Sequence, residues 1–212
     1  MDLMIRSIIS HFFPNSCLAC EKEIDPGHYL CFECLNSMAG PIMAPLELPY
    51  IDSAFSYWKY ESPMRELIHA YKFEDRPGIA RLFSNMTFEM MNTFLPATNV
   101  VVPVPTSLQA FVKRGYDTNL GILRFLSRKV EIRIENILSI SGKTVPQSTL
   151  KMKDRIDNVK DKFRLKKKPS CDSVILFDDV VTSGATASQC ARVLREGGVK
   201  DIVFFTVASA KK

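Results

Sequence analysis

The fold class is clearest in the last forty residues, which begin with Ser173-Val-Ile-Leu-Phe-Asp-Asp-Val-Val-Thr-Ser-Gly-Ala-Thr186. The apolar run predicts a buried strand from Ser173 to Phe177, and the following pattern predicts a helix from Ala185 to Glu196. The Gly197-Gly198 pair ends that helix, and a second apolar run predicts a strand from Asp201 to Val207. Strand, helix and strand in this order form a βαβ unit, which is typical of an α/β fold with a mainly parallel sheet.

The residues before this unit show the same alternation of predicted strands and helices. The predicted elements are strands over 55–60 and 99–105, helices over 64–71, 77–94 and 111–129, and a β-leaning segment over 130–140. The strand predicted over 99–105 ends in prolines and should be followed by a loop. The sequence therefore predicts an α/β domain whose mainly parallel sheet is flanked by helices.

The composition is that of a globular protein that can bury its own core. The 212 residues are 46% hydrophobic and 24% charged, which excludes the collagen-like, disordered and coiled-coil classes. A chain of this length favours one main domain with a small appendage. No apolar run approaches the ~20 residues that a membrane-crossing helix needs, so we expect no stable membrane span.

The opening residues, 1–13, are apolar but are interrupted by Asp2, Arg6 and His11, and no small-residue cleavage site follows. This pattern predicts a short amphipathic helix that packs on the protein, rather than a signal peptide. A helix that docks on a partner or touches a membrane is the alternative. We therefore expect a cytoplasmic protein, in a compartment where closely spaced cysteines more often hold a metal than form disulfides.

Four of the six cysteines form two matched pairs, Cys17-Leu-Ala-Cys20 and Cys31-Phe-Glu-Cys34, separated by ten residues. Four thiolates with this spacing can bind a structural Zn²⁺ tetrahedrally. Two disulfides or a redox pair are the alternatives, and His28 is an alternative ligand.

A proline-rich connector follows the cysteine pairs. Pro41, Pro45 and Pro49 interrupt regular secondary structure there. We therefore expect two parts: an N-terminal helix with a four-cysteine zinc finger over 1–40, and the α/β domain over 41–212.

The residues after the strand predicted over 173–177 carry the chemistry. Asp178 and Asp179 would lie at the carboxyl end of a parallel strand, where adjacent carboxylates can accept hydrogen bonds from a vicinal diol or approach a hydrated metal. The turn Thr182-Ser183-Gly184 would then begin a helix, whose N-terminal N–H groups can bind an anion. One ribose and one phosphate fit this spacing. A ligand-free turn capped by Asp179 or Thr182 is the alternative.

Positive charge is concentrated in one segment. The chain has 28 Lys and Arg against 23 Asp and Glu, and residues 151–168 hold nine basic and three acidic residues. This segment could follow a nucleic-acid backbone, with Phe163 as a stacking residue; a solvated surface is the alternative. Its basic residues are Lys151, Lys153, Arg155, Lys160, Lys162, Arg164, Lys166, Lys167 and Lys168.

These features together resemble a known family. Phe177-Asp-Asp-Val-Val-Thr-Ser-Gly-Ala-Thr186 is similar to the phosphoribosyl pyrophosphate (PRPP) signature of type I phosphoribosyltransferases. The blocks that resemble the ComF family are the four cysteines, Ile68-His-Ala-Tyr-Lys-Phe73, Val102-Pro-Val-Pro105, Lys113-Arg-Gly-Tyr116, and Gln147 with Arg155 and Asn158. They run in family order from about Cys17 to Ala208. The chain departs from the family at Asp117-Thr118, which is usually Asn-Gln, and at Ser183, which is usually Thr.

The resemblance implies a type I phosphoribosyltransferase-like fold with a small N-terminal zinc-binding module. It implies that Asp178 and Asp179 are the catalytic pair, holding the ribose hydroxyls of PRPP, and that Mg²⁺ arrives on the pyrophosphate. His69 is expected to pack on an apolar helix face rather than act as a base. The implied PRPP-binding residues are Asp178, Asp179, Val181, Thr182, Ser183, Gly184, Ala185, Thr186, Thr106, Ser107, Lys113 and Arg114.

The ComF resemblance further implies that the protein binds PRPP and handles single-stranded DNA during natural transformation. Competence-machinery proteins, such as a helicase or a channel, are then the expected partners, and they would bring a cytoplasmic protein to the inner membrane. Two alternatives stay open: a metabolic phosphoribosyltransferase that moves ribose 5-phosphate onto a nitrogenous base, and a regulator that binds PRPP without chemistry. All three bind PRPP, so the sequence leaves open whether the protein is an enzyme.

Overall fold

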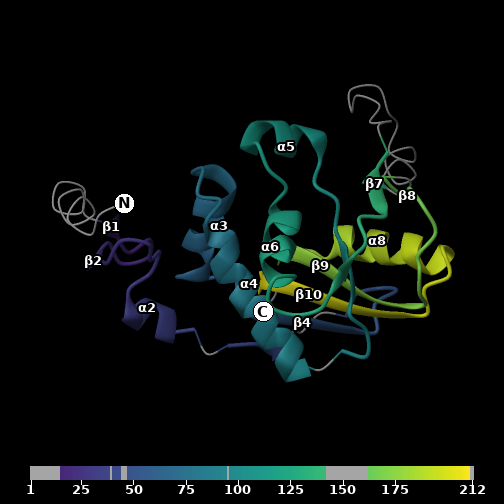
Figure 1. The fold of residues 1–212 in the computed structure, drawn as a ribbon, viewed down its shortest axis with the longest axis horizontal. Helices are drawn as coiled ribbons and strands as arrows, with labels where there is room; N and C mark the ends of the chain where they lie inside the picture. Colours follow the sequence, from purple (N-terminus) through teal and green to yellow (C-terminus); the bar gives the residue numbers. More distant parts are fainter. Residues whose placement is uncertain (1–14, 39, 44–46, 95, 142–161, 211–212) are drawn as a thin grey trace.

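The computed structural model describes residues 15–38, 40–43, 47–94, 96–141 and 162–210. Within them, one six-stranded sheet has the order β3-β4-β10-β9-β5-β6, with helices on both faces (Figure 1). Its strands are β3 (Ile42–Met43), β4 (Ser53–Lys59), β5 (Val100–Pro103), β6 (Arg133–Ile134), β9 (Ser173–Val181) and β10 (Asp201–Ser209). The pairs from β4 to β6 are parallel, and the edge strand β3 is antiparallel to β4. The predicted α/β class with a mainly parallel sheet is confirmed.

Two hydrophobic clusters fill the space between the sheet and the helices on its two faces. The helices of this domain are α3 (Met64–Phe73), α4 (Ile79–Phe94), α5 (Leu108–Arg114), α6 (Thr118–Leu126) and α8 (Ala185–Glu196). Alternate residues of β9 supply the two clusters, because successive side chains of a strand point to opposite faces. Phe177 packs with the cluster of α3, α4 and α6, and Leu176 packs with the cluster of α8.

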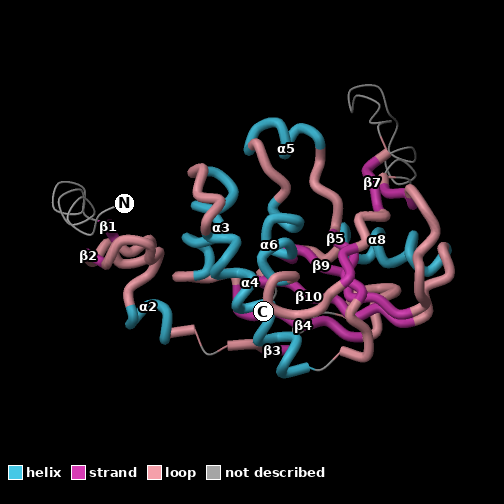
Figure 2. Tube along the Cα trace, in the orientation of Figure 1, coloured by secondary structure: helices cyan, strands magenta, loops and turns pink. Residues whose placement is uncertain are grey.

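The helical region expected over 111–129 is two helices with a turn between them, which Figure 2 shows above the sheet. Gly115 ends α5 with a φ of 79°, a conformation that favours glycine. Asp117 begins α6, because its side chain accepts a hydrogen bond from the Leu120 N–H at 2.9 Å. The acid that departs from the family pattern is therefore a helix cap, a role that asparagine fills equally well.

The β-leaning segment over 130–140 contributes two short strands. Part of it is β6, which extends the main sheet beside β5. The rest is β7 (Leu138–Ile140), which pairs antiparallel with β8 (Phe163–Leu165) in a separate two-stranded sheet. Figure 1 shows this small sheet beside α8.

The four-cysteine module consists of β1 (Asn15–Ser16), β2 (Glu23–Ile24) and α2 (Phe32–Asn36). It packs against the main domain, since Leu30 and Met38 belong to the same hydrophobic cluster as α3 and α4. The Tyr29 hydroxyl approaches Gly78 so closely that a Cβ there would lie 2.3 Å from it. The boundary between residues 40 and 41 stays a prediction, and the helix expected over 1–13 lies outside the described residues.

No helix in the described part of the chain is both long and apolar enough to cross a membrane.

Candidate functional site

The carboxyl ends of β5 and β9 form the point where the sheet reverses its winding. From β5 the chain passes through α5 and α6 to β6 on one side, whereas from β9 it passes through α8 to β10 on the other side. Adjacent connections that diverge in this way leave a crevice at the strand ends, which is where α/β proteins bind ligands. Pro103 pairs with Phe177 in the register, so Asp178 and Asp179 follow directly at the mouth of this crevice.

Asp178 is held by a small hydrogen-bond network that joins three elements. Its Oδ1 accepts hydrogen bonds from Asn119 Nδ2 and from the Asp179 N–H, each at 3.0 Å. Asn119 Nδ2 also donates to the Val104 carbonyl at 2.9 Å. Asn119 lies in the first turn of α6 and is buried, and its Oδ1 has no hydrogen-bond partner within the described residues. The crevice therefore contains one buried acceptor that a ligand hydroxyl could satisfy.

Asp179 forms an ion pair with a residue that lies 107 positions earlier in the sequence. Lys72, at the end of α3, places Nζ 2.6 Å from Asp179 Oδ1. Both side chains are withdrawn from solvent, with exposed fractions of 19% for Lys72 and 5% for Asp179. The adjacent carboxylates thus have different partners: an amide and a backbone N–H for Asp178, and an ammonium for Asp179.

The environment of Asp178 opposes its ionisation. Burial, reinforced by the neighbouring charge of Asp179, raises the pKa of Asp178 to about 7, although the hydrogen bond from Asn119 and the charge of Lys72 oppose the shift. A site with this balance favours a ligand that brings hydrogen-bond donors or positive charge to the acid pair, as the hydroxyls of a sugar do.

The turn after β9 begins α8 and exposes its hydroxyl side chains to solvent. Gly184 is the cap residue, with a φ of 78° and no side-chain capping bond, so neither Asp179 nor Thr182 caps this helix. Thr182, Ser183 and Thr186 are exposed. Ser183 Oγ accepts a hydrogen bond from the Ala185 N–H at 3.3 Å. Exposed hydroxyls beside a helix N-terminus suit an anion such as phosphate.

The remaining predicted PRPP residues lie in two separate hollows. Lys113 and Arg114 line a cavity of about 360 Å³ together with Lys72. Thr106 and Ser107 line another hollow, and Ser107 also caps α5 by accepting from the Ala110 N–H at 3.2 Å. The structure therefore brings the two basic residues next to the partner of Asp179, and it does not bring them into the hollow of the Thr106 loop.

Sequence reasoning missed Lys72 and Asn119, although each lies within or beside a motif block, Ile68–Phe73 and Lys113–Tyr116. The expectation that His69 packs on an apolar helix face is wrong. The His69 side chain is 59% exposed, and its Nδ1 lies 3.0 Å from Glu74 Oε1. His69 is thus a surface residue in the middle of α3, outside the apolar face.

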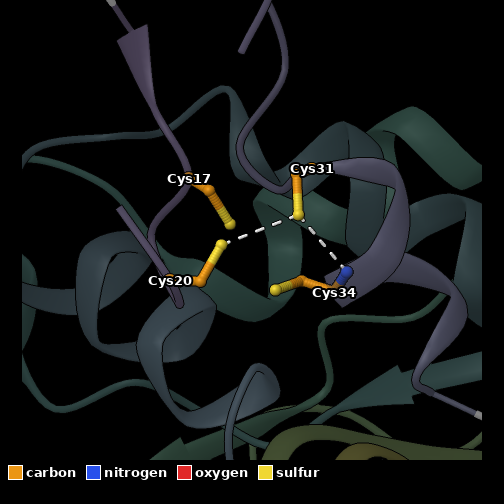
Figure 3. Close-up of side chains that lie close together, drawn as sticks. All are labelled: Cys17, Cys20, Cys31 and Cys34. Carbon is orange, nitrogen blue, oxygen red and sulfur yellow. Dashed lines mark hydrogen bonds between the residues drawn. The ribbon is translucent and has the colours of Figure 1, made fainter. Parts of the chain in front are cut away.

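The four cysteines converge at the N-terminal module (Figure 3). Their Sγ atoms all lie within 4.8 Å of one another, and all six cysteines of the chain are free thiols. Cys20 Sγ and Cys31 Sγ are 3.7 Å apart, close to the ~3.8 Å that tetrahedral Zn–S bonds of 2.3 Å require. The cluster fits a zinc ion, and it is complete without His28.

The thiols of this cluster differ in acidity. Burial opposes the ionisation of Cys17, but hydrogen bonds from the backbone of Cys31, Ala19 and Cys20 lower its pKa to about 6. Burial and the neighbouring thiols raise the pKa of Cys34. A full set of four thiolates therefore needs a cation among them, which a structural zinc ion would supply.

The basic segment is described only from Lys162 onward. Its basic residues there, Lys162, Arg164, Lys166, Lys167 and Lys168, are exposed. Phe163 is 5% exposed and packs in the hydrophobic cluster of α8, so the expectation that it stacks on a base is wrong. Lys151, Lys153, Arg155 and Lys160 lie outside the described residues.

The chain is thus an α/β protein with an acid pair at its switch point and a four-cysteine module beside it. No protein-family model matches the chain. It is 27% identical over 209 residues to "Competence protein F" of Haemophilus influenzae, which covers 92% of this chain and 90% of that protein. It is 28% identical over 145 residues to "DNA utilization protein YhgH" of Escherichia coli K12, covering 66% of this chain and 64% of the relative. A further relative is "Competence protein ComFC" of Streptococcus pneumoniae, 23% identical over 152 residues, covering 70% of this chain and 64% of that protein.

The resemblance to the ComF family is confirmed by these relatives and by the four-cysteine cluster. Among solved structures, the allosteric regulatory enzyme of purine biosynthesis aligns with a TM-score of 0.45 and 17% identity, over 65% of this chain and 29% of that one. A hypoxanthine phosphoribosyltransferase from Staphylococcus aureus aligns with a TM-score of 0.36 and 11% identity, over 64% of each chain.

Proposed function

We propose that this protein binds PRPP at the crevice between β5 and β9 and handles single-stranded DNA during natural transformation. The observation that carries the first part is the placement of Asp178 and Asp179 at the switch point, next to the exposed hydroxyls at the N-terminus of α8. The carboxylates of Asp178 and Asp179 would accept hydrogen bonds from the ribose hydroxyls, and the exposed Thr182–Thr186 turn would bind the 5′-phosphate. Mg²⁺ would enter with the pyrophosphate.

PRPP-dependent thermal stabilisation tests the pocket, because a ligand that binds only the folded state raises its melting temperature. The wild type should be stabilised by PRPP in magnesium buffer, and Asp178→Asn with Asp179→Asn should abolish that effect without changing the zinc content. Asp172→Asn with Asp201→Asn is the matched control, since it removes two exposed acids from the amino edge of the sheet. A double variant of the acid pair that PRPP still stabilises would show that the pocket is elsewhere.

The names of the relatives, competence and DNA utilization proteins, support the DNA part of the proposal. So does the exposed basic surface of Lys162 to Lys168. Nearby, α5 presents the exposed apolar side chains of Leu108, Phe111 and Val112. Basic residues combined with an exposed aromatic ring are the elements of a surface for single strands.

Fluorescence anisotropy with labelled single-stranded DNA across a salt series tests this surface, with and without PRPP. Each phosphate contact contributes ~0.7 to the slope of log affinity against log salt. The Lys167→Gln/Lys168→Gln variant should therefore lower that slope by about 1.4. Lys59→Gln with Lys129→Gln, two exposed lysines on other elements, should leave it unchanged. A wild type that does not bind DNA even at low salt would refute the DNA part alone.

Whether PRPP is consumed separates the enzyme from the sensor. A metabolic phosphoribosyltransferase would release pyrophosphate when a nitrogenous base is added, whereas a PRPP sensor would release none. Pyrophosphate release with a panel of bases, measured on the full chain, distinguishes the two.

A further inference from the structure

We propose that Lys72 is a positioning residue that exchanges partners when the crevice fills: its ammonium neutralises Asp179 in the free protein and moves to the diphosphate of the bound ligand. The inference rests on the proposed function, because it names the residue that couples the binding of the ribose diol to the binding of the diphosphate of PRPP. It gives a role to a residue that the signature of Phe177 to Thr186 does not contain.

The first observation is the position of the ion pair. Lys72 Nζ lies 2.6 Å from Asp179 Oδ1, and Asp179 is almost fully buried. An ammonium on this oxygen occupies a place that a ribose hydroxyl needs, since a vicinal diol is best bound by the free oxygens of a carboxylate. A diol and Lys72 therefore compete for Asp179.

The second observation is what surrounds the other side of Lys72. The same side chain lines the cavity of about 360 Å³ that Lys113 and Arg114 also line. Asp75 is the acidic residue of this lining, so the three basic groups leave it with an excess of positive charge. Lys113 lies over the Phe73 ring, 5.9 Å from its centroid, which places its ammonium at the same end of α3. The cavity suits a multiply charged anion.

The third observation is the nature of the side chain. Lysine carries a compact charge on a flexible stem with rotatable donors, so it can change partners without a change of backbone. Breaking a buried ion pair without replacing a partner is unfavourable. A ligand that supplies both a diol for Asp179 and a diphosphate for Lys72 replaces both partners at once, whereas a ligand with only one of them leaves one charge unpaired. The exchange would therefore select for molecules that carry both groups.

Three ligands separate this role from a merely structural ion pair: PRPP, ribose 5-phosphate, which has the diol without the diphosphate, and inorganic pyrophosphate. In calorimetric titrations in magnesium buffer, Lys72→Met should weaken PRPP binding by about tenfold or more, as expected for a lost charge-assisted hydrogen bond. Ribose 5-phosphate should bind as well as to the wild type or more tightly, because Asp179 is no longer occupied. Lys22→Met, which breaks the exposed 3.0 Å ion pair with Glu33, is the control and should change neither.

The reciprocal variant gives a second reading that does not depend on the folding of Lys72→Met. Asp179→Asn frees Lys72 and should strengthen pyrophosphate binding severalfold, while ribose 5-phosphate binding is lost. If PRPP and ribose 5-phosphate weaken in parallel in Lys72→Met, or if Asp179→Asn leaves pyrophosphate affinity unchanged, Lys72 is only structural and the inference is wrong. A wild type that binds none of the three would overturn the proposed function and this inference with it.

Discussion

Replacing Gly184 with alanine should destabilise the protein more than the same replacement at Gly115. The two glycines have the same backbone conformation, with φ and ψ of 78° and −1° at Gly184 and of 79° and −4° at Gly115. An alanine in this left-handed region costs roughly 1–2 kcal/mol. That cost is common to both variants, so the difference between them isolates the surroundings of the new methyl group.

The surroundings differ sharply. A Cβ at Gly184 would lie 2.1 Å from Leu48 Cδ2, whereas a Cβ at Gly115 would meet nothing within 4 Å. Leu48 is buried in the cluster beneath α8, and displacing a packed side chain costs roughly 1–3 kcal/mol. Gly115→Ala should therefore lower the free energy of unfolding by about 1–2 kcal/mol, and Gly184→Ala by about 2–5 kcal/mol.

Urea unfolding of the full chain measures this difference. Leu48→Ala removes the obstructing methyl groups, so in that background Gly184→Ala should cost no more than Gly115→Ala does in the wild type. The double-mutant cycle thus gives a coupling energy between positions 48 and 184 of about 1–3 kcal/mol. Equal losses for the two glycine variants, or a cycle without coupling, would show that the contact with Leu48 does not destabilise Gly184→Ala.

Three further predictions concern the metal, the acid pair and the contact of α3 with α6. Cys31→Ser with Cys34→Ser should release the zinc, detectable by elemental analysis of the purified protein, and an unchanged metal content would contradict the four-thiolate site. Because the folded state raises the pKa of Asp178 from 3.8 to about 7, the wild type should lose stability as the pH rises through that range. As the pH rises from 5 to 8, the melting temperature of Asp178→Asn should therefore rise relative to that of the wild type, by at least ~2–4 °C if the variant avoids a loss of ~1 kcal/mol in the free energy of unfolding. A difference in melting temperature that stays constant with pH would mean that Asp178 titrates normally. Tyr71→Phe removes the 2.7 Å hydrogen bond from the buried Tyr71 hydroxyl to the Thr118 carbonyl and should cost about 1–3 kcal/mol in urea unfolding, whereas a neutral effect would show that water replaces the hydroxyl.

The part of the fold that the sequence predicts best is the part that local pattern determines. The helix expected from Ala185 to Glu196 has those bounds in the structure, because its amphipathic face and the following glycines are both local signals. The strand expected to end at Phe177 continues to Val181. The apolar run stops earlier, but pairing with β10 continues to Ser209 opposite Val181, and that partner is not visible in the strand's own sequence.

The same distinction holds for the candidate site. The acid pair and the cysteine pairs are contiguous motifs, and their spacing alone predicts a site for a diol or a hydrated metal and a zinc site. The partner of Asp179 lies 107 residues away, so no local pattern reveals it. The expectation for His69 was wrong because Ile68 and Tyr71 set the buried face of α3 and position 69 falls outside it.

Two of the blocks that resemble the ComF family, Ile68–Phe73 and Lys113–Tyr116, meet around the last turn of α3. The Tyr71 hydroxyl donates to the Thr118 carbonyl, and the Tyr116 hydroxyl donates to the Tyr71 carbonyl. Both bonds fix the residue immediately before Lys72, whose ammonium reaches Asp179. The turn between α5 and α6 therefore helps to determine the position of Lys72. A change in that turn, whether by substitution or by a ligand bound at Lys113 and Arg114, would shift Tyr71 and so alter the position of Lys72 beside the acid pair. For this physical reason we expect these blocks to act as one site.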